Sequence, residues 1–382
     1  MSVTAAKGFE AAGVAAGLKS SGGLDLALVV NRGPLANAAA VFTSNRSKAN
    51  PIIWSQQVIA GGTVSAIVLN SGGANCFTGS QGFQVTHSTA EAVGAALSVG
   101  AGDVLVCSTG LIGDQLPLDK VLAGVTIAAA SLGDHGEHAS EAIMTTDSVP
   151  KRSIKRGNGY TVGGMAKGAG MLAPGLATML VVITTDVVLS SAELDIALRS
   201  ATRVSFDRLD SDGCMSTNDQ VSLLASGASG VEPRLEAFTE VLTAVCLDLA
   251  EQLQGDAEGA SHDIRIEVIG ALTEDDAVEV GRSVARNNLF KAAVFGNDPN
   301  WGRVLAAIGT TDAAFDPYDV DVAMNGVRVC HGGAPDRPRA EVDLTPRRMH
   351  LQIDLRVGDA TATILTNDLT HDYVHENSAY AS

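Results

Sequence analysis

The sequence predicts an α/β protein in which helices pack closely on buried sheets. Strand-like and helix-like segments mix along all 382 residues, and 46% of the residues are hydrophobic. Only 4% are aromatic, whereas 41 residues are glycine. A core poor in rings and rich in small apolar side chains favours close packing of helices on a sheet. The length is sufficient for two domains, or for one large domain with a substantial core.

The strands are predicted from compact apolar runs. "VSAIVLN" (64–70) and "DVLVCST" (103–109) each end in a small-residue turn, "SGGAN" and "GLIG". "TMLVVITTD" (178–186) is apolar and β-branched throughout its centre, which is typical of a strand covered on both faces.

Helices are predicted where the apolar residues recur three and four apart. The segment 190–206 has this period, and Ser190 and Glu193 have the spacing of a capping box at its start. The segment 233–255 repeats the pattern over a longer stretch. A third helix is expected after Asp298 as cap, with Pro299 in its first turn.

The last quarter of the chain is predicted to form paired strands. Two alternating runs flank Asn325-Gly326, which is a strong signal for a type I′ hairpin. A second alternating pair, 350–357 and 360–366, turns at Gly358. The only candidate break in the chain is the small-residue region 157–177.

Composition excludes several classes of protein. The net charge of −17 repels phosphate backbones, so general nucleic-acid binding is excluded. Five cysteines without a C-x-x-C pair indicate a reducing compartment. We see no signal peptide and no apolar run near the ~20 residues of a membrane helix, so we expect a cytoplasmic protein.

Three conspicuous patterns are given structural interpretations. "KRSIKR" (151–156) is expected to be a solvated loop. "GAGMLA" (168–173) has dinucleotide-type spacing, but Pro174 and Gly175 follow it, so no helix can begin there in the required register. Cys214 lacks the surroundings of a nucleophile and is expected to be a small buried residue.

Two pairs of histidines are not assigned to a metal: His371 and His375 are expected to have a structural or substrate-adjacent role. His371 and His375 lie four apart, as in a zinc protease, but no third ligand follows them and Asp372 stands in the place of the expected Glu. His135 and His138 are expected to be exposed. The sequence therefore predicts no metal site.

Thr178 admits two interpretations. As an internal residue it is an ordinary β-branched strand residue, and the residues by themselves favour this reading. If the Ala177–Thr178 bond is cut, a freed α-amine with a pKa near ~8 lies next to its own hydroxyl. Nucleophile and base are then one residue, and no histidine is required.

Blocks spread over the whole chain resemble the ornithine acetyltransferase family, the glutamate N-acetyltransferases of the acetyl-recycling arginine pathway. The similar blocks, in the family's order, are "KSSGGLDLALVV", "AAVFTSNRSKANPIIWSQ", "NSGGANCFTG", "CSTGLIG", "AIMTTDSVPK", "GGMAKGAGMLAP", "ATML", "DGCMSTND", "FGNDPNWGR" and "LTHDYVHENSAY".

This resemblance implies a layered α-β-β-α fold like that of N-terminal-nucleophile hydrolases, with the topology of ornithine acetyltransferases and aminopeptidases. It also implies self-cleavage between Ala177 and Thr178. The products would be an alpha chain, 1–177, and a beta chain, 178–382, that stay associated as α2β2. No metal or organic cofactor is implied.

The implied chemistry is two-step acetyl transfer. The Thr178 hydroxyl takes the acetyl group of N-acetylornithine and passes it to glutamate. The resemblance assigns the Thr109 side chain and the Gly110 backbone N–H to the oxyanion hole. It leaves open whether acetyl-coenzyme A is a further donor.

The resemblance also assigns the contacts to substrate. Lys167 would neutralise an α-carboxylate, and Glu258 would face an ammonium group. The full set is Thr145, Lys167, Thr178, Glu258, Asn377 and Ser382.

Two alternatives remain open at this point. The first is a related amidohydrolase or aminopeptidase in which water takes the acetyl group from Thr178. The second is an uncleaved protein that binds a dinucleotide or another ligand.

Overall fold

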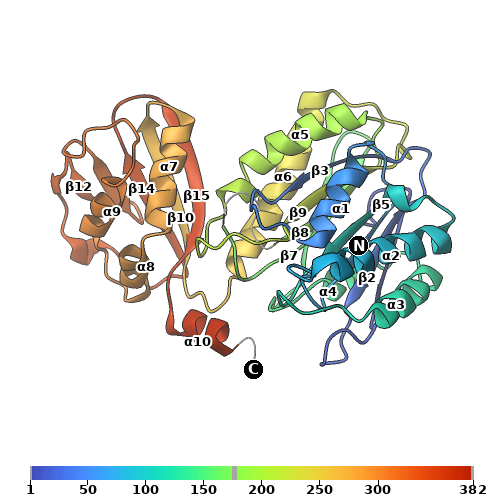
Figure 1. The fold of residues 1–382 in the computed structure, drawn as a ribbon. Coiled ribbons are helices and arrows are strands. Elements are labelled where there is room, and N and C mark those ends of the chain that lie inside the picture. Colours follow the sequence, from blue (N-terminus) through green and yellow to red (C-terminus); the bar gives the residue numbers. More distant parts are fainter. Residues whose placement is uncertain (1, 174–178, 380–382) are drawn as a thin grey trace. The chain divides into compact units, whose positions relative to one another are not determined.

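The computed structural model describes residues 2–173 and 179–379, which form two compact units (Figure 1). The first unit takes in 1–169, 175–207 and 215–253, and the second takes in 170–174, 208–214 and 254–382. The chain passes between the units several times, so neither unit is one stretch of sequence. The boundary expected after residue 177 is a site of chain cleavage and not a division between structural units, and it stays a prediction.

The first unit contains two sheets. The four-stranded sheet has the order β1 (Phe9–Val14), β2 (Leu26–Asn31), β4 (Ala66–Asn70), β5 (Val104–Ser108). The five-stranded sheet has the order β3 (Asn37–Phe42), β9 (Gln220–Ala225), β8 (Leu180–Thr185), β7 (Thr161–Lys167), β6 (Lys151–Arg156). In each sheet one neighbouring pair is parallel, β4 with β5 and β8 with β9, and the other pairs are antiparallel.

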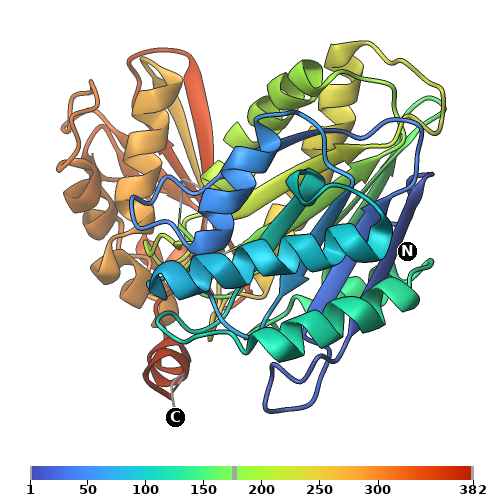
Figure 2. The same cartoon turned by 45° about the vertical axis from the view of Figure 1, so that its right-hand side comes forward.

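The two sheets pack face to face, and helices cover their outer faces (Figures 1 and 2). Between the sheets, Ile67 and Leu105 share one apolar cluster with Met165 and Val182. The helices of this unit are α1 (Asn50–Ile59), α2 (Gly79–Leu97), α3 (Leu118–Ala130), α4 (Gly136–Ala142), α5 (Ser191–Arg203) and α6 (Leu235–Gly255), with the short 3-10 turns Ala101–Asp103 and Phe206–Arg208 near them. Helices α2 and α3 pack on the four-stranded sheet, and α5 and α6 on the five-stranded sheet. The predicted α-β-β-α layering is therefore confirmed in this unit.

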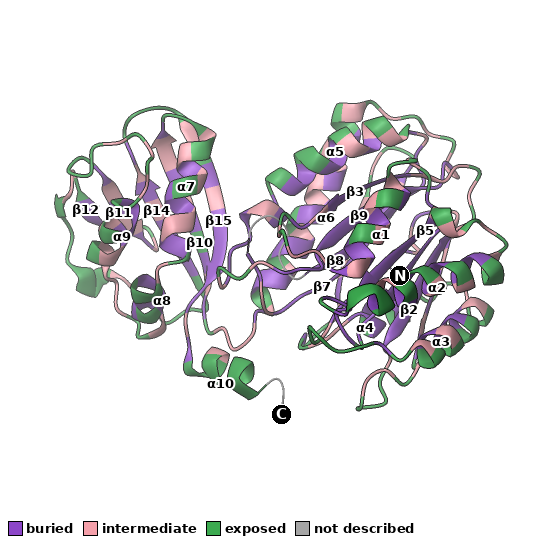
Figure 3. Ribbon diagram, in the orientation of Figure 1, coloured by how far each residue is buried: buried purple, intermediate pink, exposed green. Residues whose placement is uncertain are grey.

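The central strands are buried along their whole length (Figure 3). Every residue of β4, β5, β8 and β9 is buried, because each sheet is covered on both sides. Close approach is permitted by Gly164 of β7, where a Cβ atom would lie 3.0 Å from the Leu249 side chain of α6. The continuous apolar runs of the sequence thus correspond to strands inside a layered core.

The second unit is one mixed sheet with helices packed on it. Its strand order is β13 (Ala334–Pro335), β12 (Val327–His331), β11 (Asp321–Met324), β14 (Arg348–Asp354), β10 (Asp263–Ala271), β15 (Ala360–Asn367). Its helices are α7 (Glu274–Ala285), α8 (Asn288–Phe295), α9 (Trp301–Ile308) and α10 (His371–Ala379), with a 3-10 turn at Arg339–Glu341.

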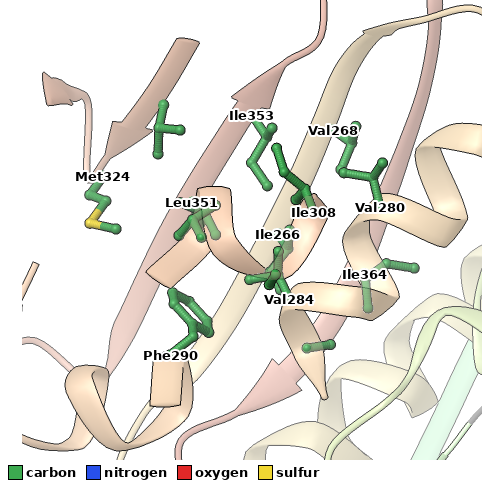
Figure 4. Close-up of a cluster of buried hydrophobic side chains, with 14 of the residues drawn as sticks. Ile266, Val268, Val280, Val284, Phe290, Ile308, Met324, Leu351, Ile353 and Ile364 are labelled. Carbon is green, nitrogen blue, oxygen red and sulfur yellow. The ribbon is translucent and has the colours of Figure 1, made fainter. Parts of the chain in front are cut away.

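Alternation along the strands builds the core of the second unit (Figure 4). On β10, Ile264, Ile266 and Val268 are buried while the residues between them are less so. These side chains join one cluster with Val284 of α7 and Phe290 of α8. One face of the sheet is therefore the apolar face that these helices cover.

Phe290→Ala is expected to lower the free energy of unfolding by about 3–5 kcal/mol, because the ring is 1% exposed and its removal leaves a cavity. The matched control is Leu289→Ala, since Leu289 is 62% exposed on the same helix and should change stability by less than about 0.5 kcal/mol. Denaturant unfolding of the whole protein measures both. Equal losses for the two variants would contradict the assigned core.

Several local predictions are confirmed. Ser190 caps α5, and its side chain and that of Glu193 form the reciprocal bonds of a capping box. The hairpin between β11 and β12 turns at Asn325 and Gly326, with φ values of 46° and 81° as a type I′ turn requires. His135 and His138 are exposed.

The prediction of a solvated loop at 151–156 is wrong. This segment is β6, and the alternation of the strand turns Lys151 and Ser153 inward. Burial of these polar groups is possible because each has an acidic partner: Lys151 pairs with Asp147, and the Ser153 hydroxyl donates to Asp248.

Two further local predictions are wrong. Helix α9 begins after Asn300, not after Asp298, whose carboxylate instead accepts a hydrogen bond from the Asn300 amide. Cys214 is exposed, because it lies in a turn whose backbone N–H is bound by the Asp212 carboxylate.

Candidate active site

Thr109 and Gly110 follow directly on β5. Since β4 and β5 are parallel, the loops after both strands leave the sheet at the same edge. The two loops are joined by backbone bonds, such as that from Gly73 N–H to the Thr109 carbonyl at 3.0 Å. Gly110 has a φ of 131°, and a Cβ there would lie 2.8 Å from the Gly73 nitrogen, so the position requires glycine.

This loop presents two unused hydrogen-bond donors. The Thr109 side chain is 2% exposed, and its oxygen accepts a hydrogen bond from Lys167 Nζ at 3.4 Å. No acceptor for the Thr109 hydroxyl proton or for the Gly110 N–H lies within residues 2–173 and 179–379. A buried hydroxyl and an adjacent N–H without acceptors are suited to bind an oxygen on which negative charge develops.

Lys167 ends β7 and is 1% exposed. In the register of β7 with β8, it is paired with Leu180, which is two residues after Thr178 in the chain. The structure therefore brings Lys167 and Thr109 together. The resemblance had assigned both residues to the same site.

Asp147 links Thr145 to Lys167. Its carboxylate accepts from the Thr145 N–H at 2.9 Å and from the Gly168 N–H at 2.7 Å, and it pairs with Lys151 Nζ at 2.5 Å. Burial by itself would raise the pKa of Asp147, but the charges of Lys167 and Lys151 outweigh it and lower the pKa to about 2.

The depressed pKa of Asp147 predicts an effect on acid stability. Its folded-state pKa lies below the unfolded value near 3.9, so the stabilisation of about 2 kcal/mol is present above pH 4 and is lost as the pH falls through about 2. We expect the difference in unfolding free energy between the wild type and Asp147→Asn to shrink over that range. Denaturant unfolding at several pH values measures it, and a difference that does not vary with pH would refute the assignment.

Asp219 was not predicted as a site residue. It immediately precedes β9, is fully buried, and accepts a hydrogen bond from the Met179 N–H at 3.1 Å. Burial raises the pKa of Asp219 well above its usual range, although the Met179 N–H and nearby Lys167 oppose this. The sequence around Asp219 does not predict its contact with Met179, because only the pairing of β8 with β9 brings residue 219 beside residue 179.

Glu258 and Asn377 lie in the second unit and are bonded to each other. Asn377 Nδ2 donates to Glu258 Oε2 at 2.9 Å. Gly170 lies against the same carboxylate, since a Cβ there would be 2.4 Å from Glu258 Oε2. Glu258 also lines a cavity of about 80 Å³, together with Asp212, Lys291 and Tyr373. The structure thus brings together these two predicted substrate contacts.

Three predicted site residues, Ala177, Thr178 and Ser382, lie outside the described residues. In the described part of the chain, no three His, Cys, Asp or Glu side chains are grouped so that they could hold a metal ion. His371 and His375 lie on the exposed helix α10. No helix among the residues described has the length and apolar character to cross a membrane.

Comparisons with known proteins extend over the full length. Residues 10–382 match the model of the ArgJ family. A Streptomyces coelicolor protein named arginine biosynthesis bifunctional protein ArgJ is 64% identical over 100% of both chains, and a Thermobifida fusca protein of the same name is 60% identical over the same shares. A crystal structure of ornithine acetyltransferase from Mycobacterium tuberculosis, complexed with ornithine, is 52% identical over 47% of this chain and 96% of that chain, with a TM-score of 0.43. The resemblance found in the sequence blocks is confirmed, and the chain belongs to the ArgJ family of arginine-biosynthesis enzymes.

Proposed function

We propose that this enzyme cleaves itself between Ala177 and Thr178 and then transfers acetyl groups from N2-acetylornithine to glutamate through an acetyl ester on Thr178. The observation that supports this best is the pair of donors at Thr109 and Gly110, which have no acceptor among the described residues and of which Thr109 contacts the Lys167 ammonium. Amide cleavage needs such donors for the carbonyl oxygen of its tetrahedral intermediate.

In the first half-reaction the Thr178 hydroxyl attacks the acetyl carbonyl, and the free α-amine of Thr178 takes the hydroxyl proton. The C–N bond breaks, the same proton passes to the leaving nitrogen, and ornithine departs. In the second half-reaction the glutamate amine attacks the ester, N-acetylglutamate leaves, and the threonine hydroxyl is restored. The carbonyl oxygen is bound by Thr109 and Gly110 in both steps.

The substrate contacts divide by charge. We propose that Lys167 binds the α-carboxylate common to both substrates, near Thr145. Glu258, held by Asn377, is proposed to bind the ammonium of ornithine. Ser382 is proposed as a further contact, on the resemblance alone.

Pairing of β7 with β8 supports the association of the two chains after cleavage. Residues 162–167 and 180–185 lie on opposite sides of the proposed cleavage site and form one antiparallel ladder. We propose that the chains stay together for this reason, that the assembly is α2β2, that it is cytoplasmic, and that no cofactor takes part.

Intact mass of the purified protein tests the processing step. We expect two polypeptides with the masses of 1–177 and 178–382, and a single full-length species would favour the uncleaved ligand-binding protein. The products formed from acetylornithine and glutamate test the transfer step. We expect N-acetylglutamate, whereas acetate alone would identify a hydrolase.

The word bifunctional in the relatives' names supports a second acetyl donor. We propose acetyl-coenzyme A for this role. Incubation with acetyl-coenzyme A and glutamate, without acetylornithine, should then yield N-acetylglutamate.

A further inference from the structure

Three charged side chains, Asp147, Lys151 and Lys167, are buried in the first unit, and Lys167 contacts Thr109 of the proposed oxyanion loop. The side chains of Asp147 and Lys151 have no exposed surface, and Lys167 is 1% exposed. Charged side chains are rarely buried to this extent unless paired charges or hydrogen bonds offset the lost hydration. Only Lys167 among the three was assigned to substrate by resemblance, so the other two need an explanation.

The hydrogen bonds of Asp147 join three segments that are separate in the fold. One oxygen accepts from the Thr145 N–H, in the loop after α4, and the other accepts from Lys151 at the start of β6 and from the Gly168 N–H just beyond β7. The Gly168 N–H belongs to the peptide that joins it to Lys167. One carboxylate therefore fixes the backbone at both Thr145 and Lys167.

The same carboxylate is the counter-charge for two ammonium groups. The charges of Lys167 and Lys151 both favour ionised Asp147, and Lys151 also donates a hydrogen bond to it. Lys167 also interacts with the charges of Lys19, from the loop after β1, and of Asp219, directly before β9. Because burial penalises a charged ammonium, the interaction with the Asp147 carboxylate favours the charged form of Lys167, the form that would bind a substrate carboxylate.

We infer that Asp147 is a positioning residue for acetyl transfer, which aligns Thr145 and Lys167 through their backbones and supplies the negative charge that keeps the Lys167 ammonium ready for the α-carboxylate of the substrate. Lys151 has the opposite influence, since it competes with Lys167 for the same carboxylate. This inference rests on the proposed function, because it assumes that Lys167 binds substrate.

The experiment is the pH dependence of the first half-reaction. Ornithine released by the processed enzyme in a single turnover with N-acetylornithine is measured between about pH 6 and pH 10. Wild type is compared with Asp147→Asn, Lys151→Met and Asp248→Asn. Asp248→Asn is the matched control, because Asp248 is also an acidic partner of strand β6, where it pairs with Lys155 and accepts a hydrogen bond from the Ser153 hydroxyl.

As the pH rises, activity is expected to fall along an alkaline limb of the profile. In Asp147→Asn this limb should lie about 1–3 pH units below that of the wild type, the range produced by one nearby opposite charge. Lys151→Met should move the same limb to higher pH, because Asp147 then serves Lys167 alone. Asp248→Asn should leave the profile unchanged.

A purely structural Asp147 predicts a different pattern. Both variants would then lose activity by the same factor at every pH, or shift the limb in the same direction, and either result overturns the inference. If Asp147→Asn does not fold, Lys151→Met still decides, since an upward shift supports the inference and an unmoved or lowered limb refutes it. A wild-type enzyme that releases no ornithine would instead refute the proposed function.

Discussion

Thr178→Ala is expected to give a single full-length polypeptide that transfers no acetyl groups. The substitution removes the oxygen that attacks the peptide bond during processing and the acetyl carbonyl during turnover. Loss of a nucleophile of this kind reduces turnover on the order of 10⁶-fold in the serine-protease case, so residual activity should fall below detection. Intact mass measures processing, and formation of N-acetylglutamate measures turnover.

Two controls separate this effect from misfolding. Thr178→Ser keeps a hydroxyl and should still cleave and turn over, although at altered rates. Thr185 lies on the same strand β8, and Thr185→Ala removes a hydroxyl that donates to the Thr161 carbonyl at 3.0 Å, so cleavage should persist. A Thr178→Ala protein that is cut at the usual place would move the nucleophile to another residue.

Thr109→Ala is expected to lower kcat by about 10²–10³-fold, which corresponds to about 3–4 kcal/mol of transition-state stabilisation. The physical reason is that the Thr109 proton has no acceptor within the described residues, while its oxygen is already bonded to Lys167. The Thr109 hydroxyl can therefore donate to the acetyl oxygen of the substrate, and this hydrogen bond becomes stronger as negative charge develops on that oxygen.

Steady-state kinetics of processed enzyme tests the role of Thr109. We expect kcat to fall with little change in KM for acetylornithine, which is the signature of an interaction made in the transition state. Thr109→Ser keeps the donor and should recover most of the rate. A raised KM with an unchanged kcat would assign Thr109 to substrate binding instead.

Local patterns were sufficient for much of the fold. The apolar runs before "SGGAN" and "GLIG" became β4 and β5, and the capping box and the Asn325-Gly326 turn formed as expected. Each of these features depends on residues that are close in the sequence, so a short segment is sufficient to predict it.

The wrong prediction for 151–156 and the missed Asp219 both depend on contacts that form only in the folded chain. "KRSIKR" has the composition of a solvated loop, and its burial is possible only because Asp147 and Asp248 face it from other elements. Asp219 has no local signal at all, because its contact with Met179 depends on the parallel pairing of β8 and β9. Asp248 is distant in sequence from Ser153, and Asp147, although only four residues before Lys151, is placed beside it by the fold and not by a local pattern. Composition of a short segment does not contain such contacts.

The sequence by itself determined the α/β class through local periodicity and the family through short blocks, and the resemblance to that family supplied the candidate nucleophile and the candidate oxyanion residues. The tertiary structure alone decided that the buried Lys151 pairs with Asp147 and that the Thr109 and Gly110 donors have no acceptor among the described residues. It also decided how the chain divides into two interleaved units. The free energy of a buried charge depends on every group packed around it, and those groups are brought together only when the chain has folded.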